Sequence, residues 1–110
     1  MDKNLEQLAE LIGVDTESIT MLLDMFFESL DDDVENIGQA IESGDLSEVH
    51  ASAHKLKGLA ANLRFEDLVE FCKRIEVGAK SGEALDYAEK YETLRKEAQS
   101  MKEWYKSVRV

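Results

Sequence analysis

Residues 53–76 (AHKLKGLAANLRFEDLVEFCKRIE) decide how this chain folds. Through and just before this stretch, apolar residues recur at steps of three and four, the period of an amphipathic α-helix. They are Leu46, Val49, Ala53, Leu56, Ala60 and Leu63. Because an α-helix turns about 100° per residue, His54 falls roughly 130° from the centre of this apolar stripe. We therefore expect His54 to meet solvent on a helix whose opposite face is buried.

The predicted helix surrounds His54 with mostly small side chains. Its neighbours at three, four and seven residues' distance are Ser47, His50, Ala51, Lys57, Gly58 and Ala61. A neutral imidazole is a nucleophile near physiological pH, and the Lys57 ammonium could balance the charge of a phosphoryl group on the ring. The pattern indicates a reactive histidine that another protein can approach closely. The alternative is an ordinary surface histidine, with the small residues serving close helix packing.

The segment His54-Lys55-Leu56-Lys57-Gly58, followed by Ala60, Leu63 and Cys72-x-x-x-Glu76, resembles the histidine phosphotransfer (HPt) domain family. The resemblance implies an all-α fold, an antiparallel four-helix bundle. In that family a histidine receives a phosphoryl group and hands it to an aspartate of a receiver domain. By position, His54 would be phosphorylated, Lys57 would balance the charge, and Gly58 would admit the receiver.

From the small and basic residues near His54 we expect a partner-binding surface, referred to below as the docking surface. It consists of His50, Ala51, Lys55, Gly58, Ala61 and Arg64. The resemblance implies two kinds of partner, a response-regulator receiver domain and a hybrid sensor histidine kinase. A narrower likeness, at residues 22–26 and at Trp104 and Tyr105, is to single-domain phosphotransfer proteins of bacterial quorum-sensing relays.

Two residues depart from the usual family pattern. Leu59 stands where a small residue commonly follows the Lys-Gly pair, and Arg64 stands where a glycine often ends the helix. A left-handed residue at a helix end is easiest for glycine, so Arg64 leaves the end of this helix open. These departures keep a second function under consideration: a helical-bundle adaptor that binds receiver or kinase domains without being phosphorylated.

A metal site is a third hypothesis, because His50 and His54 lie one turn apart, a spacing used by helical zinc ligands. Zinc needs further ligands, which Asp45, Ser47 or Glu48 could supply only marginally, and the chain has no third histidine. We expect no metal and no cofactor in this chain, and the family resemblance implies that Mg²⁺ belongs to the partner receiver domain. Neither a glycine-rich phosphate loop nor a kinase nucleotide motif is present, which predicts a phosphocarrier without autonomous kinase activity.

The 110 residues suit one domain, 1–110, that is large enough to bury a core without disulfide bonds or structural metals. Proline is absent and 34% of the residues are charged, which favours helices. The single cysteine, Cys72, falls in an apolar register, as expected for a small buried residue in a reducing compartment. Because the first residues lack a basic stretch followed by an apolar run, we expect no secretory signal, and we expect no bilayer-spanning helix because no apolar stretch is long enough. We expect a soluble cytoplasmic monomer.

The net charge of −11 is concentrated in residues 1–50, which carry fourteen acidic residues and one basic residue. This half of the chain would repel nucleic acid, and no basic face is long enough to compensate. Residues 51–80 carry a net charge of +2, and their basic side chains could favour an acidic partner. We interpret Asp31-Asp32-Asp33 as a solvated acidic patch, with a surface that tunes partner choice as the alternative.

Capping and breaking residues predict the helix boundaries. A short helix over 4–12 ends at Gly13, and a long helix begins after Asp15 or Thr16 and ends before Gly44. Asp45 starts the His54 helix, a fourth helix covers 65–80 before Ser81-Gly82, and a fifth covers 87–108. The long helix presents its inner face through Ile19, Leu22, Leu23, Phe26, Leu30, Val34, Ile37 and Ile41.

Overall fold

The computed structural model describes residues 4–81 and 86–109, and every regular element in these two ranges is an α-helix. The helices are α1 (Leu5–Ile12), α2 (Thr16–Ser43), α3 (Leu46–Asn62), α4 (Glu66–Ser81) and α5 (Tyr87–Val108). The all-α prediction is confirmed, and the helix bounds agree with those predicted to within about one residue. Of the predicted break at Ser81-Gly82, Gly82 lies outside the described residues.

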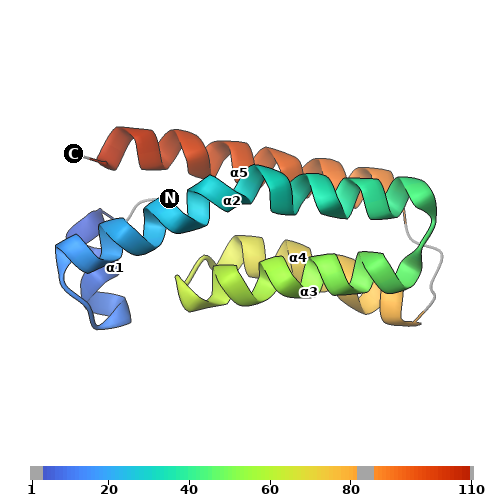
Figure 1. Cartoon of the computed structure of the whole chain (residues 1–110), viewed down its shortest axis with the longest axis horizontal. Helices are drawn as coiled ribbons and strands as arrows, with labels where there is room; N and C mark the ends of the chain where they lie inside the picture. Colours follow the sequence, from blue (N-terminus) through green and yellow to red (C-terminus); the bar gives the residue numbers. More distant parts are fainter. Residues whose placement is uncertain (1–3, 82–85, 110) are drawn as a thin grey trace.

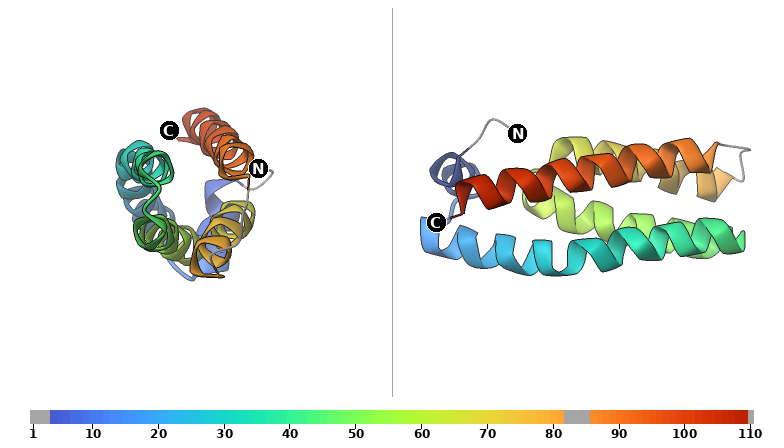
Figure 2. Two further views of the ribbon diagram at one scale, coloured as in Figure 1. Left: turned by 90° about the vertical axis from the view of Figure 1, so that its right-hand side faces the viewer. Right: turned by 90° about the horizontal axis from the view of Figure 1, so that it is seen from above.

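Four helices form an antiparallel bundle, and α1 lies at one end of it (Figure 1). Seen nearly end-on in the left view of Figure 2, the four long helices occupy the corners of the bundle. Helix α3 packs against α2 on one side and against α4 on the other, while α5 closes the bundle between α2 and α4. The predicted four-helix bundle with a short additional N-terminal helix is confirmed.

Local capping explains where the helices begin and end. The side chain of Asp15 accepts a hydrogen bond from the Ser18 N–H at the start of α2, and Asp45 accepts one from Glu48 at the start of α3. Gly44 ends α2 with φ +74°, a left-handed conformation that costs glycine little. Because these signals are local, the sequence sufficed to place both boundaries.

The core lies along the bundle axis and includes most residues of the predicted apolar stripes. Two predicted core positions are wrong, because Leu22 and Leu46 are exposed. Leu46 is the first residue of α3, so no preceding helical turn covers its side chain. Cys72 is fully buried, as predicted, and burial, with the Glu76 charge adding to it, raises the pKa of its thiol to about 12.

The interpretation of Asp31-Asp32-Asp33 as a solvated patch is wrong for one of its three residues. Asp31 and Asp32 are exposed, but Asp33 is only 4% exposed. The cause is helical geometry, since Asp33 lies on the side of α2 that turns toward α3. Asp31 pairs instead with Lys102 of α5, at 2.9 Å.

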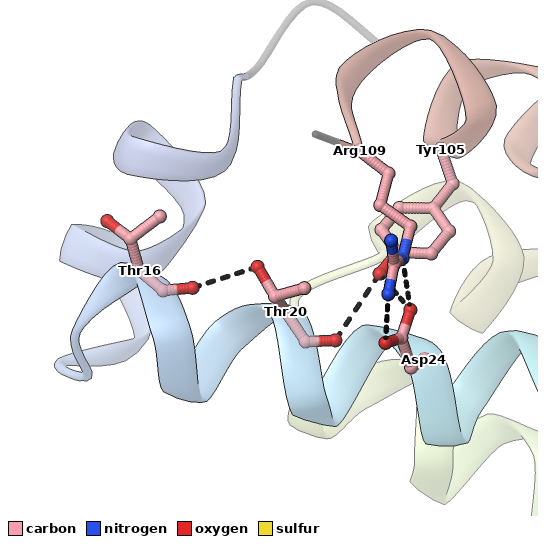
Figure 3. Close-up of polar contacts among 5 residues, drawn as sticks. All are labelled: Thr16, Thr20, Asp24, Tyr105 and Arg109. Carbon is pink, nitrogen blue, oxygen red and sulfur yellow. Dashed lines mark hydrogen bonds and ion pairs between the residues drawn. The ribbon is translucent and has the colours of Figure 1, made fainter.

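A polar cluster fastens the C-terminal end of α5 to α2 (Figure 3). The Asp24 carboxylate accepts hydrogen bonds from Nε and Nη2 of Arg109, at 2.7 and 2.8 Å, and from the Tyr105 hydroxyl, at 2.5 Å. The same hydroxyl lies 3.3 Å from the Thr20 carbonyl oxygen. These donors lower the pKa of Asp24 to about 2, the Arg109 hydrogen bond being the largest cause.

Candidate functional site

His54 lies on the outer surface of α3, as predicted. Its side chain is 64% exposed, whereas the flanking apolar residues Ala53 and Leu56 are fully buried. Because those two residues fix the rotation of α3 against the bundle, the imidazole points away from the core. The ring is therefore accessible to another protein.

A buried carboxylate of the neighbouring helix α4 contacts the exposed ring. Nδ1 of His54 lies 2.6 Å from Oε1 of Glu76, a residue that is 8% exposed. The other carboxylate oxygen, Oε2, lies 2.5 Å from Nζ of Lys57. His54 and Lys57, one turn apart on α3, thus bind the two oxygens of one carboxylate.

The contacts with Lys57 and His54 keep Glu76 ionised, and the ionised Glu76 in turn fixes the tautomer of His54. Burial by itself would raise the pKa of Glu76, but the hydrogen bonds from Lys57 and His54 outweigh it and leave the pKa below its ordinary value. An ionised carboxylate can only accept hydrogen bonds. Nδ1 of His54 therefore carries the proton, and the lone pair of the neutral ring is on Nε2.

His50 lies beside this cluster. Its Nε2 is 3.5 Å from Oε1 of Glu76, and its ring is nearly parallel to that of His54, with an interplanar angle of 9° and centroids 6.0 Å apart. Within residues 4–81 and 86–109, no three or more His, Cys, Asp or Glu side chains are placed to hold a metal ion. The two histidines instead share a carboxylate.

The small residues of the docking surface lie on the same exposed side of α3 as His54. Ala51, Gly58 and Ala61 are all exposed, and a Cβ added at Gly58 would meet no atom within 4 Å. The backbone is therefore open to a partner at Gly58. On the side facing α2, Nζ of Lys55 lies 3.1 Å from Oδ1 of Asp33.

Arg64 lies apart from the other residues of the docking surface. It follows the end of α3, about 15 Å along the helix axis from His54 at 1.5 Å per residue. Its φ of 63° is left-handed, and the N–H groups of Arg64 and Phe65 bond to the carbonyls of Ala61 and Ala60. This hydrogen-bond pattern is the Schellman motif, with arginine at the position that usually holds glycine. Arginine thus replaces the glycine that is common in the family at this position, and the turn that ends α3 is kept.

From the sequence, Glu76 is identified only as part of the family motif and Asp33 only as part of the acidic patch, and the burial of neither residue is predicted. A signal existed for Glu76, since it follows the buried Cys72 by four residues and so lies on the inward side of α4. Charged residues are rarely buried unless they are paired. A carboxylate in that register therefore suggests a cationic partner on the adjacent helix.

Residues 21–104 match the Hpt domain family. The chain belongs to that family. Hpt domains perform histidine phosphotransfer in two-component signalling, act as phosphocarriers rather than as classical enzymes, and interact with receiver domains and kinases. A search of curated proteins and a search of solved structures each found no match. Across the described parts of this Hpt chain, no helix has the length and apolar character needed to cross a membrane.

Proposed function

We propose that this Hpt protein carries a phosphoryl group on His54 between aspartates of receiver domains in a multistep phosphorelay. The observation that supports this most directly is the 2.6 Å contact between Nδ1 of His54 and Glu76 on a ring that remains largely exposed. In the neutral ring, this contact places the proton on Nδ1 and the lone pair on Nε2, so the exposed side chain has a nitrogen that can act as a nucleophile.

In the proposed step, the Nε2 lone pair attacks the phosphorus of an aspartyl phosphate. The N–P bond forms, the P–O bond to the aspartate breaks, and the aspartate leaves as a carboxylate. Nδ1 keeps its proton, so the phosphorylated ring carries a positive charge. The Glu76 carboxylate, 2.6 Å from Nδ1, stabilises that charge. The reverse sequence passes the group to a second aspartate.

Lys57 would neutralise the phosphoryl group, as its position in the family motif implies. Its ammonium lies one helical turn from His54 and is held by Oε2 of Glu76. Phosphoryl transfer depends mainly on positioning and charge neutralisation, so a fixed cation beside the ring is an effective contribution. The Mg²⁺ that the reaction needs would come with the receiver domain, and this chain would hold no cofactor of its own.

The proposed partners are a response-regulator receiver domain and a hybrid sensor histidine kinase, with the protein acting as a cytoplasmic monomer. An unpaired, buried Cys72 suits a reducing compartment. The adaptor that binds the same domains without phosphorylation is the competing function. The adaptor is less favoured, because binding alone would not require the Glu76 carboxylate to contact Nδ1 of His54.

The test is phosphoryl transfer from a receiver domain charged with acetyl phosphate. The wild-type protein should gain an acid-labile, base-stable phosphoryl group, and the His54→Gln variant should gain none. His50→Gln is the matched control, because it removes the other histidine of the chain and should still be labelled. Equal labelling of wild type and His54→Gln would exclude His54, and binding without labelling of either protein would favour the adaptor.

A further inference from the structure

Two carboxylates lie on opposite sides of α3, and each holds a lysine next to His54. Among the described residues, Asp33 of α2 and Glu76 of α4 are the buried charged side chains. Glu76 binds Lys57 on the α4 side, and Asp33 binds Lys55 on the α2 side. The Glu76 pair belongs to the site already described, but the Asp33 pair has no assigned role.

Asp33 is poorly satisfied for a buried carboxylate. Its Oδ1 contacts Nζ of Lys55 at 3.1 Å, and its buried Oδ2 has no hydrogen-bond partner. The side chain of Lys55 is 64% exposed, so the pair is open to solvent at the lysine end. A buried carboxylate with a single partner loses hydration that the pair only partly replaces, and replacing such an ion pair by uncharged residues is often neutral or stabilising. The fold alone therefore does not explain an aspartate here.

We propose that Asp33 sets the affinity of the docking surface for its receiver domain by holding Lys55 in an intramolecular ion pair. This inference rests on the proposed function, and it concerns partner binding at the same site. Lys55 directly follows His54 on α3 and is 64% exposed, so its ammonium is near the path of an acidic partner that reaches His54. On docking, the partner's carboxylates would compete with Asp33 for the Lys55 ammonium.

This competition weakens the complex, which suits a carrier that must leave one partner before it meets the next. Asp33 reduces, without abolishing, the attraction that the exposed Lys55 exerts on an acidic surface. Replacing Asp33 with asparagine would free the Lys55 charge and tighten the complex. The effect should depend on Lys55 and weaken with ionic strength, because opposite charges near a surface are screened by salt.

The experiment measures phosphoryl transfer from an acetyl-phosphate-charged receiver domain to wild type, Asp33→Asn, Lys55→Gln and the double variant, at low and high salt. Asp33→Asn should raise kcat/KM about three- to tenfold at low salt through a lower KM, with kcat unchanged. Lys55→Gln should lower kcat/KM by a similar factor. In the Lys55→Gln background, the Asp33→Asn change should have no further effect, because contacting residues are not additive.

Asp31 and Lys102 provide the matched control. They form a similar ion pair, at 2.9 Å, between α2 and α5 rather than beside α3. Asp31→Asn and Lys102→Gln make the same charge changes and should leave kcat/KM within about twofold of wild type. Equal gains from Asp31→Asn and Asp33→Asn, or a gain from Asp33→Asn that persists without Lys55, would overturn the proposal.

Two further measurements separate this proposal from the proposed function. Phosphoramidate donates a phosphoryl group without protein docking, so it should label the control variants Asp31→Asn and Lys102→Gln at wild-type rates, and the gain in rate of Asp33→Asn should be absent with this donor. If the receiver labels none of the proteins, the relay function fails, and calorimetric binding of the unphosphorylated receiver then tests Asp33 by the same comparison. If Asp33→Asn loses helicity, the comparison of kcat/KM between Lys55→Gln and Lys102→Gln replaces it as the test. Equal kcat/KM values for these two variants would overturn the role of Lys55.

Discussion

Nδ1 of His54 and Oε1 of Glu76 lie 2.6 Å apart, although 22 residues separate them along the chain. The contact exists because α3 and α4 pack side by side, with the exposed edge of one helix meeting an inward-facing position of the other. One short interaction thus joins the exposed ring to the buried part of the bundle. It ties the tautomer of the histidine to the packing of two helices.

Glu76→Gln should slow phosphoryl transfer to His54. The amide can still accept a hydrogen bond from Nδ1, but it lacks the charge that stabilises the phosphorylated ring. We expect the rate to fall about 10- to 100-fold, the range found when a carboxylate that orients a metal-binding histidine is removed. Stopped-flow or quench-flow transfer assays would measure it. Glu70→Gln, at an exposed position of α4, is the control, and an equal loss there would contradict the role of Glu76.

Two helical glycines should respond in opposite directions to alanine. A Cβ at Gly58 meets nothing within 4 Å, so Gly58→Ala should raise the free energy of unfolding by about 0.5 to 1 kcal/mol through helix propensity. At Gly38 a Cβ would lie 2.7 Å from Cζ and Oη of Tyr91. Gly38→Ala should therefore lower the free energy of unfolding by about 1 to 3 kcal/mol, the cost of overpacking. Urea unfolding followed by circular dichroism measures both.

A large side chain at Gly58 tests the docking surface itself. Gly58→Trp should keep the helical signal and the melting temperature close to those of Gly58→Ala, because the position opens onto solvent. The indole would stand between the receiver domain and the backbone of α3, so transfer should be strongly slowed. Labelling by phosphoramidate should change far less. Unchanged transfer from the receiver in a folded Gly58→Trp protein would argue against this surface.

Arg64 adopts the left-handed conformation that glycine adopts most easily. Arg64→Gly should raise the free energy of unfolding by about 1 kcal/mol, the cost of this conformation for a residue with a Cβ. Arg64→Ala also removes the charge but retains the Cβ, so it should give no such gain. Chemical denaturation of the three proteins would measure the difference. Equal stabilities of the glycine and alanine variants would show that the conformation carries no strain.

The contribution of Asp24 should disappear in acid. Its pKa is about 2 in the folded protein and about 3.9 in an unfolded chain. A lowered carboxyl pKa stabilises the fold above the unfolded value, and this stabilisation is lost as pH falls from about 4 through about 2. Asp24→Asn should lower the melting temperature at pH 7 and have little effect at pH 2. Asp32→Asn, at an exposed site on α2, is the control, and an equal fall in melting temperature there would contradict the role of Asp24.

The sequence predicted the helices well because their signals are local. Asp15, Asp45 and Gly44 act on backbone groups within a turn of themselves, so no knowledge of the rest of the fold was needed. Exposure of His54 was predicted correctly for the same reason, since the apolar stripe of α3 fixes which side of the helix faces out.

Contacts between helices were not predictable in this way. The register behind Cys72 indicates that Glu76 faces inward, but which side chains of α3 it meets depends on how α4 packs against α3. The burial of Asp33 depends in the same way on how α2 is rotated against α3, which a single helical pattern does not specify. Leu22 shows the same limit, because it belongs to the apolar pattern of α2 yet is exposed in the folded bundle. The roles of the individual docking residues remain predictions that the experiments above address.

The imidazole of His54 is already uncovered in the free protein, on a helix held by a closed core. A carrier built in this way needs no lid to open before it reacts and none to close afterwards. Turnover would then be governed by how often partners collide with it, and the abundance of each receiver in the cell would decide which one obtains the phosphoryl group.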